Sequence, residues 1–147
     1  MANNVVRVSM KRSRFFYNWL LFLRPMHGMT KSQMQVAAEF LRRRDELARK
    51  TNDEGIINGI LLSNREYEKI EAKFGITRQY LRVVMTHLKK ARFFTEGGIN
   101  LKYVPMIGEH DDRFRLMFDF NIDNNEDGRD GESGQAEEAV SGEDGAE

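Results

Sequence analysis

The chain has 147 residues, a net charge of zero at neutral pH, 40% hydrophobic residues and no cysteine. This composition predicts one domain with a tail and excludes disulfide frameworks, thiolate zinc sites and cysteine nucleophiles. The histidines His27, His87 and His110 are widely separated, so no metal site is predicted. The longest apolar run, residues 15–23, is far shorter than the roughly 20 residues of a membrane span. Because no signal-peptide cleavage site follows that run, we expect a cytoplasmic protein without membrane contact.

The zero net charge conceals two oppositely charged regions. Residues 1–121 contain 22 Lys/Arg and 13 Asp/Glu, whereas residues 122–147 contain one arginine and ten acidic residues. The acidic tail lacks aromatic residues and is predicted to be disordered, because it cannot bury enough apolar surface to offset the entropy of ordering. A basic body favours nucleic acid as a partner, since it attracts phosphate. The alternative is a tail that only promotes solubility.

Residues 1–28 are predicted to form a strand and a short aromatic helix that pack on the core. Apolar and polar residues alternate over residues 5–11, as in a strand. The following FFYNWLLFL segment predicts a mostly buried helix that ends at Arg24-Pro25. A membrane-surface anchor is the weaker interpretation, because this segment has no polar face.

Three helix starts share a hydroxyl at the N-cap, provided by Thr30, Ser63 and Thr77. Gln33 and Glu66 follow the first two at the spacing of a capping box. The helices are predicted to span residues 31–50, 64–74 and 78–91. The first carries an arginine-rich face with acidic neighbours, which we interpret as solvated surface rather than a phosphate site. Residues 56–62 are interpreted as a short buried connector, with a strand as one option.

The second and third of these helices are predicted to cross steeply. Only Gly75, Ile76 and Thr77 separate them, and glycine suits the left-handed end of a helix. On the third helix, an inward apolar stripe is expected from Leu81, Val84, Met85 and Leu88. The opposite surface is expected to consist of Gln79, Arg82, Val83, Thr86 and Lys90. Between residues 75 and 95 there are five Lys/Arg and no acidic residue, as expected of a surface that faces phosphates.

The segment after the third helix predicts a β-hairpin. Gly97-Gly98 marks its turn, and Ile99, Leu101 and Tyr103 alternate with polar residues as in a returning strand. A hairpin after such a helix is a wing, although Glu96 near the tip favours a hairpin that only closes the core. Residues 114–120 alternate as well and predict a final strand, which we expect to pair with residues 5–10.

The order of these motifs over residues 61–105 resembles a winged helix-turn-helix domain. The leucine-serine entry, Ile70, the Phe-Gly-Ile-Thr turn and the glycine-containing wing carry the resemblance. From residue 22 onward, the chain also resembles small proteins of tailed phages that infect gut Bacteroides-type bacteria. The expected fold is therefore α+β, mainly helical, with residues 1–28 packing on a winged domain at 29–121 and a disordered tail at 122–147.

We expect a non-catalytic protein that binds double-stranded DNA, as a transcription or replication regulator of phage origin. Residues 77–90, beginning at Thr77, would enter the major groove and residues 92–105 would touch the backbone. Base-edge contacts are predicted for Arg78, Gln79, Arg82, Val83 and Thr86. Phosphate contacts are predicted for Tyr80, Lys89, Lys90, Arg92 and Lys102.

No enzyme signature is present. The sequence lacks a glycine-rich phosphate loop, a nucleophile elbow and a metalloprotease motif, so no catalytic residue and no cofactor is predicted. Residues 108–112 are interpreted as a polar loop rather than a metal site. The competing hypothesis is an assembly component or protein-interaction module of a phage particle, with a protein partner or a second copy bound by aromatic residues of the N-terminal helix. The residues named for that interface are Phe15, Phe16, Tyr17, Trp19 and Phe22.

Overall fold

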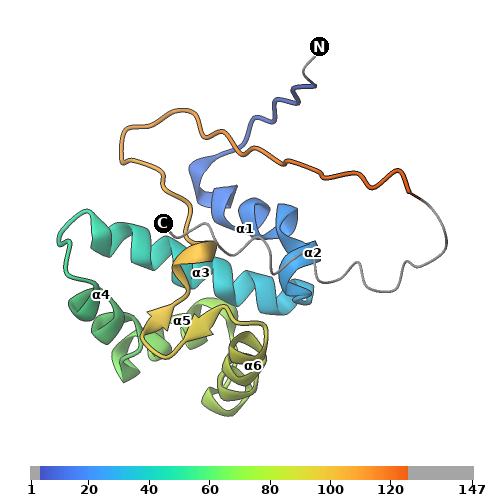
Figure 1. Ribbon diagram of the computed structural model, residues 1–147. Helices are drawn as coiled ribbons and strands as arrows, with labels where there is room; N and C mark the ends of the chain where they lie inside the picture. The colour runs from blue at the N-terminus through green and yellow to red at the C-terminus, as the bar shows by residue number, and fades with distance from the viewer. Residues whose placement is uncertain (1–3, 126–147) are drawn as a thin grey trace. The chain divides into compact units, whose positions relative to one another are not determined.

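A computed structural model describes residues 4–125, and its contacts divide the chain into two units, Met1–Glu109 and His110–Glu147. Within residues 4–125, the fold is mainly helical, with six α-helices and one two-stranded antiparallel sheet. All of these elements belong to the first unit (Figure 1). The first unit contains α1 and α2 together with the later helices. The predicted disorder of the tail lies largely outside the described residues.

Helix α3 (Lys31–Ala48) lies at the centre of the first unit. In Figure 1, α1 (Arg12–Phe22) and α2 (Arg24–His27) lie on one side of α3. Helices α4 (Glu54–Leu61), α5 (Asn64–Phe74) and α6 (Arg78–Lys90) lie on the other. Because α3 separates the two groups, the N-terminal helices do not cover α6.

The predicted N-terminal helix is confirmed, and it is fixed to the core by buried polar contacts. Phe16, Trp19 and Leu20 are buried, and the Trp19 Nε1–H donates to the carbonyl of Tyr103 at 2.8 Å. The buried His27 ring accepts the Met29 N–H at Nδ1, which leaves Nε2 to donate to the Leu20 carbonyl at 2.8 Å. Burial lowers the pKa of His27, and the charge of Arg24 lowers it further. The hydrogen bond to the Leu20 carbonyl raises the pKa but does not outweigh these effects.

The three predicted N-caps are confirmed. Thr30 and Gln33 form a complete capping box at the start of α3. The Ser63 side chain accepts the Glu66 N–H at the start of α5, and the Thr77 side chain accepts the Tyr80 N–H at the start of α6. These bonds satisfy backbone donors that the first turn of a helix otherwise leaves unpaired. Local sequence therefore fixes where all three helices begin.

The interpretation of residues 56–62 as a connector or strand is wrong, because they lie mostly within α4. Asp53 caps this helix by accepting the N–H groups of Gly55 and Ile56. Ile57 and Leu61, four residues apart, are buried on one helical face. Ile56 and Ile60 remain exposed, so the apolar run reflects a helix with only one side against the core.

The predicted hairpin forms, but it is much shorter than expected. Strands β1 (Phe94–Thr95) and β2 (Gly98–Ile99) pair with Phe94 opposite Ile99. Leu101 and Tyr103 do not continue the strand, because Leu101–Tyr103 is a 3-10 helix, η1. The Asn100 side chain caps η1 by accepting the Lys102 N–H, which turns the chain out of the extended conformation.

Gly98 is required where the hairpin meets α4. Its φ is +135°, and a Cβ at this position would lie 2.2 Å from the Asn58 side chain. Gly97 has open space around its Cβ position and no positive φ. The second glycine of the pair therefore fixes how the hairpin packs.

A chain of aromatic rings joins the hairpin to the helices. Phe40 of α3 contacts Tyr67 of α5 and Phe94 of β1 edge-on, with ring centroids 6.5 and 5.2 Å apart. Phe93 contacts Phe94 at 5.0 Å and Tyr103 at 6.3 Å. Burial raises the pKa of Tyr103. These contacts fix the position of the hairpin relative to α3 and α5.

The two other predicted strands are corrected. Residues 5–11 and 114–120 have no regular secondary structure, so the expected pairing between them does not form a ladder. Alternation produces a strand only where a neighbour accepts its backbone hydrogen bonds. In the second unit, the described residues contain stacked rings of Phe118 and Phe120, with centroids 6.2 Å apart. No helix within residues 4–125 has the length and apolarity needed to cross a membrane.

Candidate nucleic-acid interface

Helices α5 and α6 are joined by a three-residue turn at the end of the molecule opposite α1. Gly75 ends α5 with a φ of +64°, and its N–H donates to the carbonyl of Glu71. Ile76 donates to the same carbonyl at 3.1 Å. The predicted glycine C-cap is thus confirmed, and it directs the chain into α6 within one turn.

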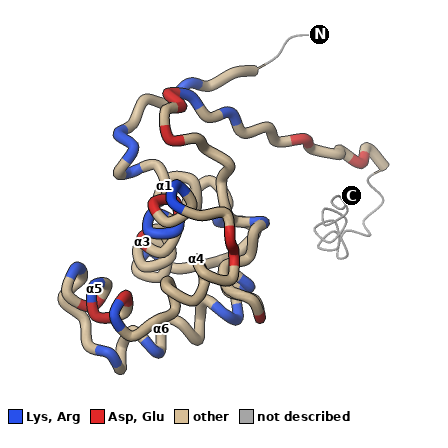
Figure 2. The backbone as a smooth tube through the Cα atoms, turned by 90° about the vertical axis from the view of Figure 1, so that its left-hand side faces the viewer, with Lys and Arg blue, Asp and Glu red and all other residues tan. Residues whose placement is uncertain are grey.

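The inward residues of α6 are those expected. Leu81, Val84, Met85 and Leu88 are buried against the core. The opposite surface, here called the outer α6 face, is exposed and comprises Gln79, Arg82, Val83, Thr86 and Lys90. Figure 2 shows Lys and Arg positions but no acidic position along α6. The Thr86 hydroxyl donates to the carbonyl of Arg82 at 3.0 Å, which leaves its methyl group and oxygen lone pairs available.

Arg78, which was predicted to contact the bases, is half-buried and already has partners on α5. Its guanidinium pairs with Glu71, donates to the Asn64 side chain at 3.1 Å and lies 5.5 Å from the centre of the Tyr67 ring. Burial raises the pKa of Tyr67, and the Arg78 charge partly opposes that rise. The three-residue turn between α5 and α6 places Arg78 beside these partners on α5.

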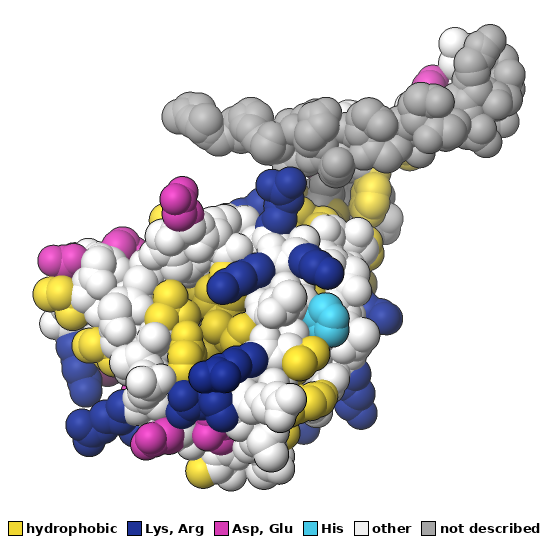
Figure 3. Space-filling model, turned by 90° about the horizontal axis from the view of Figure 1, so that it is seen from below, with side chains coloured by type: hydrophobic (Ala, Val, Ile, Leu, Met, Phe, Trp, Pro, Cys, Tyr) yellow, Lys and Arg dark blue, Asp and Glu magenta, His cyan; other side chains and the backbone are white. Residues whose placement is uncertain are grey.

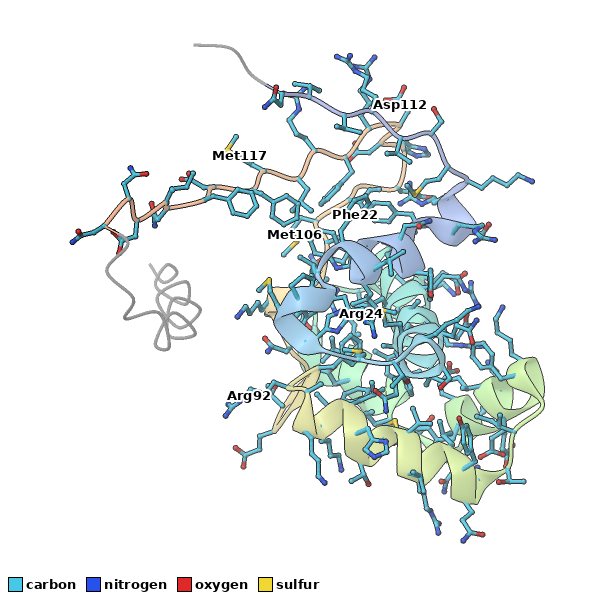
Figure 4. The ribbon with its side chains drawn as sticks, turned by 90° about the vertical axis from the view of Figure 1, so that its right-hand side faces the viewer. Phe22, Arg24, Arg92, Met106, Asp112 and Met117 are labelled. Carbon is cyan, nitrogen blue, oxygen red and sulfur yellow. The ribbon has the colours of Figure 1, made fainter. Side chains whose placement is uncertain are left out.

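The remaining predicted contacts lie at the edges of the outer α6 face and beyond it. Thr77 is exposed and caps α6, and the Tyr80 side chain is 44% exposed. Arg92 is exposed, has a φ of +64°, and extends away from the helices (Figure 4). Lys102 is exposed but lies on η1 rather than on the expected returning strand.

Arg92 occupies the left-handed position that follows α6. The Arg92 N–H donates to the Lys89 carbonyl at 3.0 Å, and the Phe93 N–H donates to the Leu88 carbonyl at 2.9 Å. This pair of bonds is a Schellman motif, in which glycine is the usual residue at the left-handed position. A non-glycine residue there costs of order 1 kcal/mol.

A hollow of about 470 Å³ lies between the start of α5, the second half of α6 and the hairpin. Leu62, Tyr67, Met85 and Phe94 provide apolar walls, and Lys89, Thr95 and Glu96 provide polar groups. Seen from below, this end of the molecule shows apolar side chains between Lys and Arg side chains (Figure 3). Lys89 therefore shares its surroundings with an acidic residue, unlike Arg82 on the outer face.

The arginine run of α3 was expected to be solvated, and the structure corrects this. Arg44 is buried and pairs with Glu54 of α4, while Arg43 pairs with Glu39 and with Glu66 of α5. Arg42 pairs with Glu39 at 2.7 Å. These charges hold α3, α4 and α5 together.

Glu39 is the centre of this ion-pair group and is only 4% exposed. Burial alone would raise the pKa of its carboxyl. The hydrogen bonds and charge of Arg42, together with the charges of Arg43 and Lys73, reverse that effect and hold the pKa below its ordinary value. The carboxylate therefore stays ionised inside the domain and stabilises it.

No protein-family model, curated protein or solved structure matches this chain. The site therefore has to be judged on its own geometry. Within residues 4–125, no three His, Asp or Glu side chains are placed together so that they could hold a metal ion.

Sequence reasoning missed the residues that surround Arg78. Glu71 and Asn64 lie seven and fourteen positions before it and on another helix, so helical periodicity does not connect them. The signal that could have found Glu71 is its place in the last turn of α5, directly before a three-residue turn. Such a turn brings the end of one helix close to the start of the next.

Proposed function

We propose that the protein binds double-stranded DNA as a winged helix-turn-helix domain and catalyses no reaction. In this proposal α6 lies in the major groove and the short β1–β2 hairpin lies beside the DNA backbone. The outer α6 face carries the argument, because it is exposed, free of acidic residues and carries the cations Arg82 and Lys90. A helix of this kind fits between two phosphate chains without repulsion.

We assign distinct roles to the residues along α6. Gln79, Arg82 and Thr86 can offer hydrogen-bonding groups to base edges, and the exposed Val83 can contact a thymine methyl group. Lys90 and Arg92, at the end of α6, are suited to phosphate. Tyr80, Lys89 and Lys102 are assigned peripheral phosphate contacts. Arg78 and Thr77 are assigned positioning roles, since their side chains hold the turn and the helix start.

Binding of the full chain to a fluorescent generic duplex, measured over a range of salt concentrations, tests this proposal. The double variant Arg82→Ala/Lys90→Ala should lose affinity by at least about tenfold at low salt. Its salt slope should fall by about 1, because loss of the Lys90 phosphate contact removes roughly one unit. These side chains are exposed, so the fold should be retained.

The matched control is Arg49→Ala/Lys50→Ala, which removes the same charge at the far end of α3. Within residues 4–125, Asp45 of α3 is the carboxylate that pairs with Arg49, and this pair is exposed at the arginine, so little stability is lost. The affinity of this control for the duplex should change by less than about threefold. Equal losses in both double variants, or binding that does not depend on salt, would contradict the proposal.

A protein-interaction role is the second candidate, and exposed apolar side chains near α1 and α2 favour it. Leu21, Phe22 and Met26 are 44%, 51% and 46% exposed, and Met106 is 78% exposed. Phe22 and Met106 are labelled in Figure 4. The interface expected from the aromatic helix is thus reduced, because Phe16 and Trp19 are buried. Light scattering of the full chain, compared with Phe22→Ser/Met26→Ser, tests whether these residues join copies of the protein.

A further inference from the structure

We propose that the outer α6 face also binds the chain's own acidic tail, residues 126–147, so that tail and DNA compete for one surface. The competition rests on the proposed function, whereas the tail contact itself does not. The tail is a partner of defined chemistry that is present in every molecule. The outer α6 face would therefore not be free before DNA arrives.

The first support is the state of the cations. Among residues 4–125, no carboxylate lies within ion-pair distance of Arg82, Lys90 or Arg92. The arginines of α3 and Arg78 of α6 already have carboxylate partners. An anionic segment gains most at charges that lack partners, because it displaces only water and salt ions.

The second support is charge complementarity. Residues 126–147 contain nine acidic residues and one arginine, and six of the acidic residues form three adjacent pairs. Val140 is the largest aliphatic residue among them, so binding would depend on charge rather than on apolar burial. Such a contact should weaken as salt is added, because the screening length falls to about 3 Å at 1 M.

The third support is the length of chain available. Thirty-eight residues follow Glu109, the last residue of the first unit. An extended residue spans up to about 3.5 Å, whereas a 100-residue domain has a radius of gyration of about 13 Å. The connection therefore permits contact with any surface of that unit. Covalent attachment also provides an effective concentration of order millimolar.

Another exposed basic segment lies near the N-terminus. Arg7, Lys11 and Arg14 are exposed and precede the first acidic residue of the chain, Glu39. Arg14 lies on α1, whereas Arg7 and Lys11 lie in residues 4–11, which have no regular secondary structure, so the three charges do not form one helical array. Arg82 and Lys90 are both held on α6, and this fixed arrangement favours the outer α6 face as the tail site.

The test uses three full-length proteins and NMR without DNA. The first carries the natural tail, and the second has all nine acidic residues of 126–147 replaced by Asn or Gln. The third has the same tail residues in shuffled order, which preserves charge and length. Amide shifts are compared at low salt and at about 1 M salt.

Neutralising the tail should shift the amides of Arg82, Thr86 and Lys90 at low salt, and the difference should vanish at 1 M salt. The shuffled tail should resemble the natural one. Generic duplex DNA should bind about tenfold more tightly to the neutralised protein at low salt, with a steeper salt slope, because the competitor is gone.

Equal spectra for natural and neutralised tails would overturn the tail contact, even if both proteins bind DNA. Shifts confined to residues 7–14, or shifts that grow with protein concentration, would also overturn it, since they place the tail elsewhere or on a second copy. Shifts on α6 without any duplex binding would uphold the tail contact and contradict the proposed function.

Discussion

Helices α3 and α6 both carry several basic residues, but the two sets differ in whether carboxylates lie beside them. Arg42, Arg43 and Arg44 of α3 lie against carboxylates from three helices. On the outer α6 face, Arg82 and Lys90 point to solvent and have no carboxylate within ion-pair distance among residues 4–125. A count of Lys and Arg does not separate these cases, whereas the position of the carboxylates does.

This comparison also divides α6 itself. Arg78 is held by Glu71 and Asn64 of α5, so it resembles the α3 arginines rather than Arg82. The charged residues of this protein thus fall into a set that joins helices and a set available to a ligand. Substitutions that affect only one set provide the sharpest tests.

Glu39→Gln should have the largest effect on stability and none on DNA binding. The replacement leaves Arg42 and Arg43 without their shared buried carboxylate and should cost about 3 kcal/mol. Glu46→Gln is the matched control, because Glu46 pairs with the same Arg42 but its side chain is 54% exposed. It should cost less than about 0.5 kcal/mol. Urea unfolding of both variants measures the difference, and similar losses would contradict the proposed importance of burial.

Acid should reproduce part of the Glu39 effect. Because the folded pKa of Glu39 is lowered from its ordinary value of 4.5, the unfolded chain binds its proton first as pH falls. The stability from Glu39 is therefore complete above about pH 4.5 and is lost as pH falls through the lower folded pKa. Unfolding free energies of Glu39→Gln should vary less with pH in this range than those of the natural protein. Parallel pH profiles would refute the assignment.

Arg78→Ala should reduce stability by about 1 kcal/mol, because it removes the contacts with Glu71, Asn64 and Tyr67. Duplex affinity should fall less than in Arg82→Ala, which leaves stability unchanged within about 0.5 kcal/mol. Thermal unfolding and fluorescence anisotropy on the same two proteins separate the effects. A larger affinity loss in Arg78→Ala would place Arg78 in the ligand-binding set.

Arg92→Gly should have the smallest effect and the opposite sign. Glycine adopts the positive φ of this position without strain, so stability should rise by about 0.5 kcal/mol. Loss of one phosphate contact should lower the salt slope for duplex binding by about one unit. The control Arg92→Asn also tolerates this backbone conformation and removes the charge. Unchanged binding by both variants would exclude Arg92 from the interface.

The sequence predicted the features that depend on local physics. Thr30, Ser63 and Thr77 mark helix starts because their hydroxyls act within one turn, and Gly75 marks a helix end through its own φ. The inward stripe of α6 follows from helical periodicity. Asp53 is an N-cap signal of the same kind for α4. The apolar run after it was interpreted as a connector or a strand, so the helix was missed.

Features that depend on distant partners were not predictable in this way. The alternation in residues 5–11 and 114–120 is compatible with a strand, but neither segment belongs to a sheet within residues 4–125. Sequence patterns predict Arg44 and Arg78 to be surface cations. The packing of α4 and α5 places carboxylates beside them, which the patterns do not show. The sequence therefore predicts which segment forms the candidate site. The structure shows which side chains of that segment are exposed and available to a ligand.

The most direct test of DNA binding by the outer α6 face is an NMR titration of the full chain with a generic duplex at low salt. The account predicts that the largest amide shifts occur at Gln79, Arg82, Thr86 and Lys90, with smaller shifts near Arg92 and almost none along α3. Shifts centred on α1 and α2, or spectra that do not change when duplex is added, would contradict it.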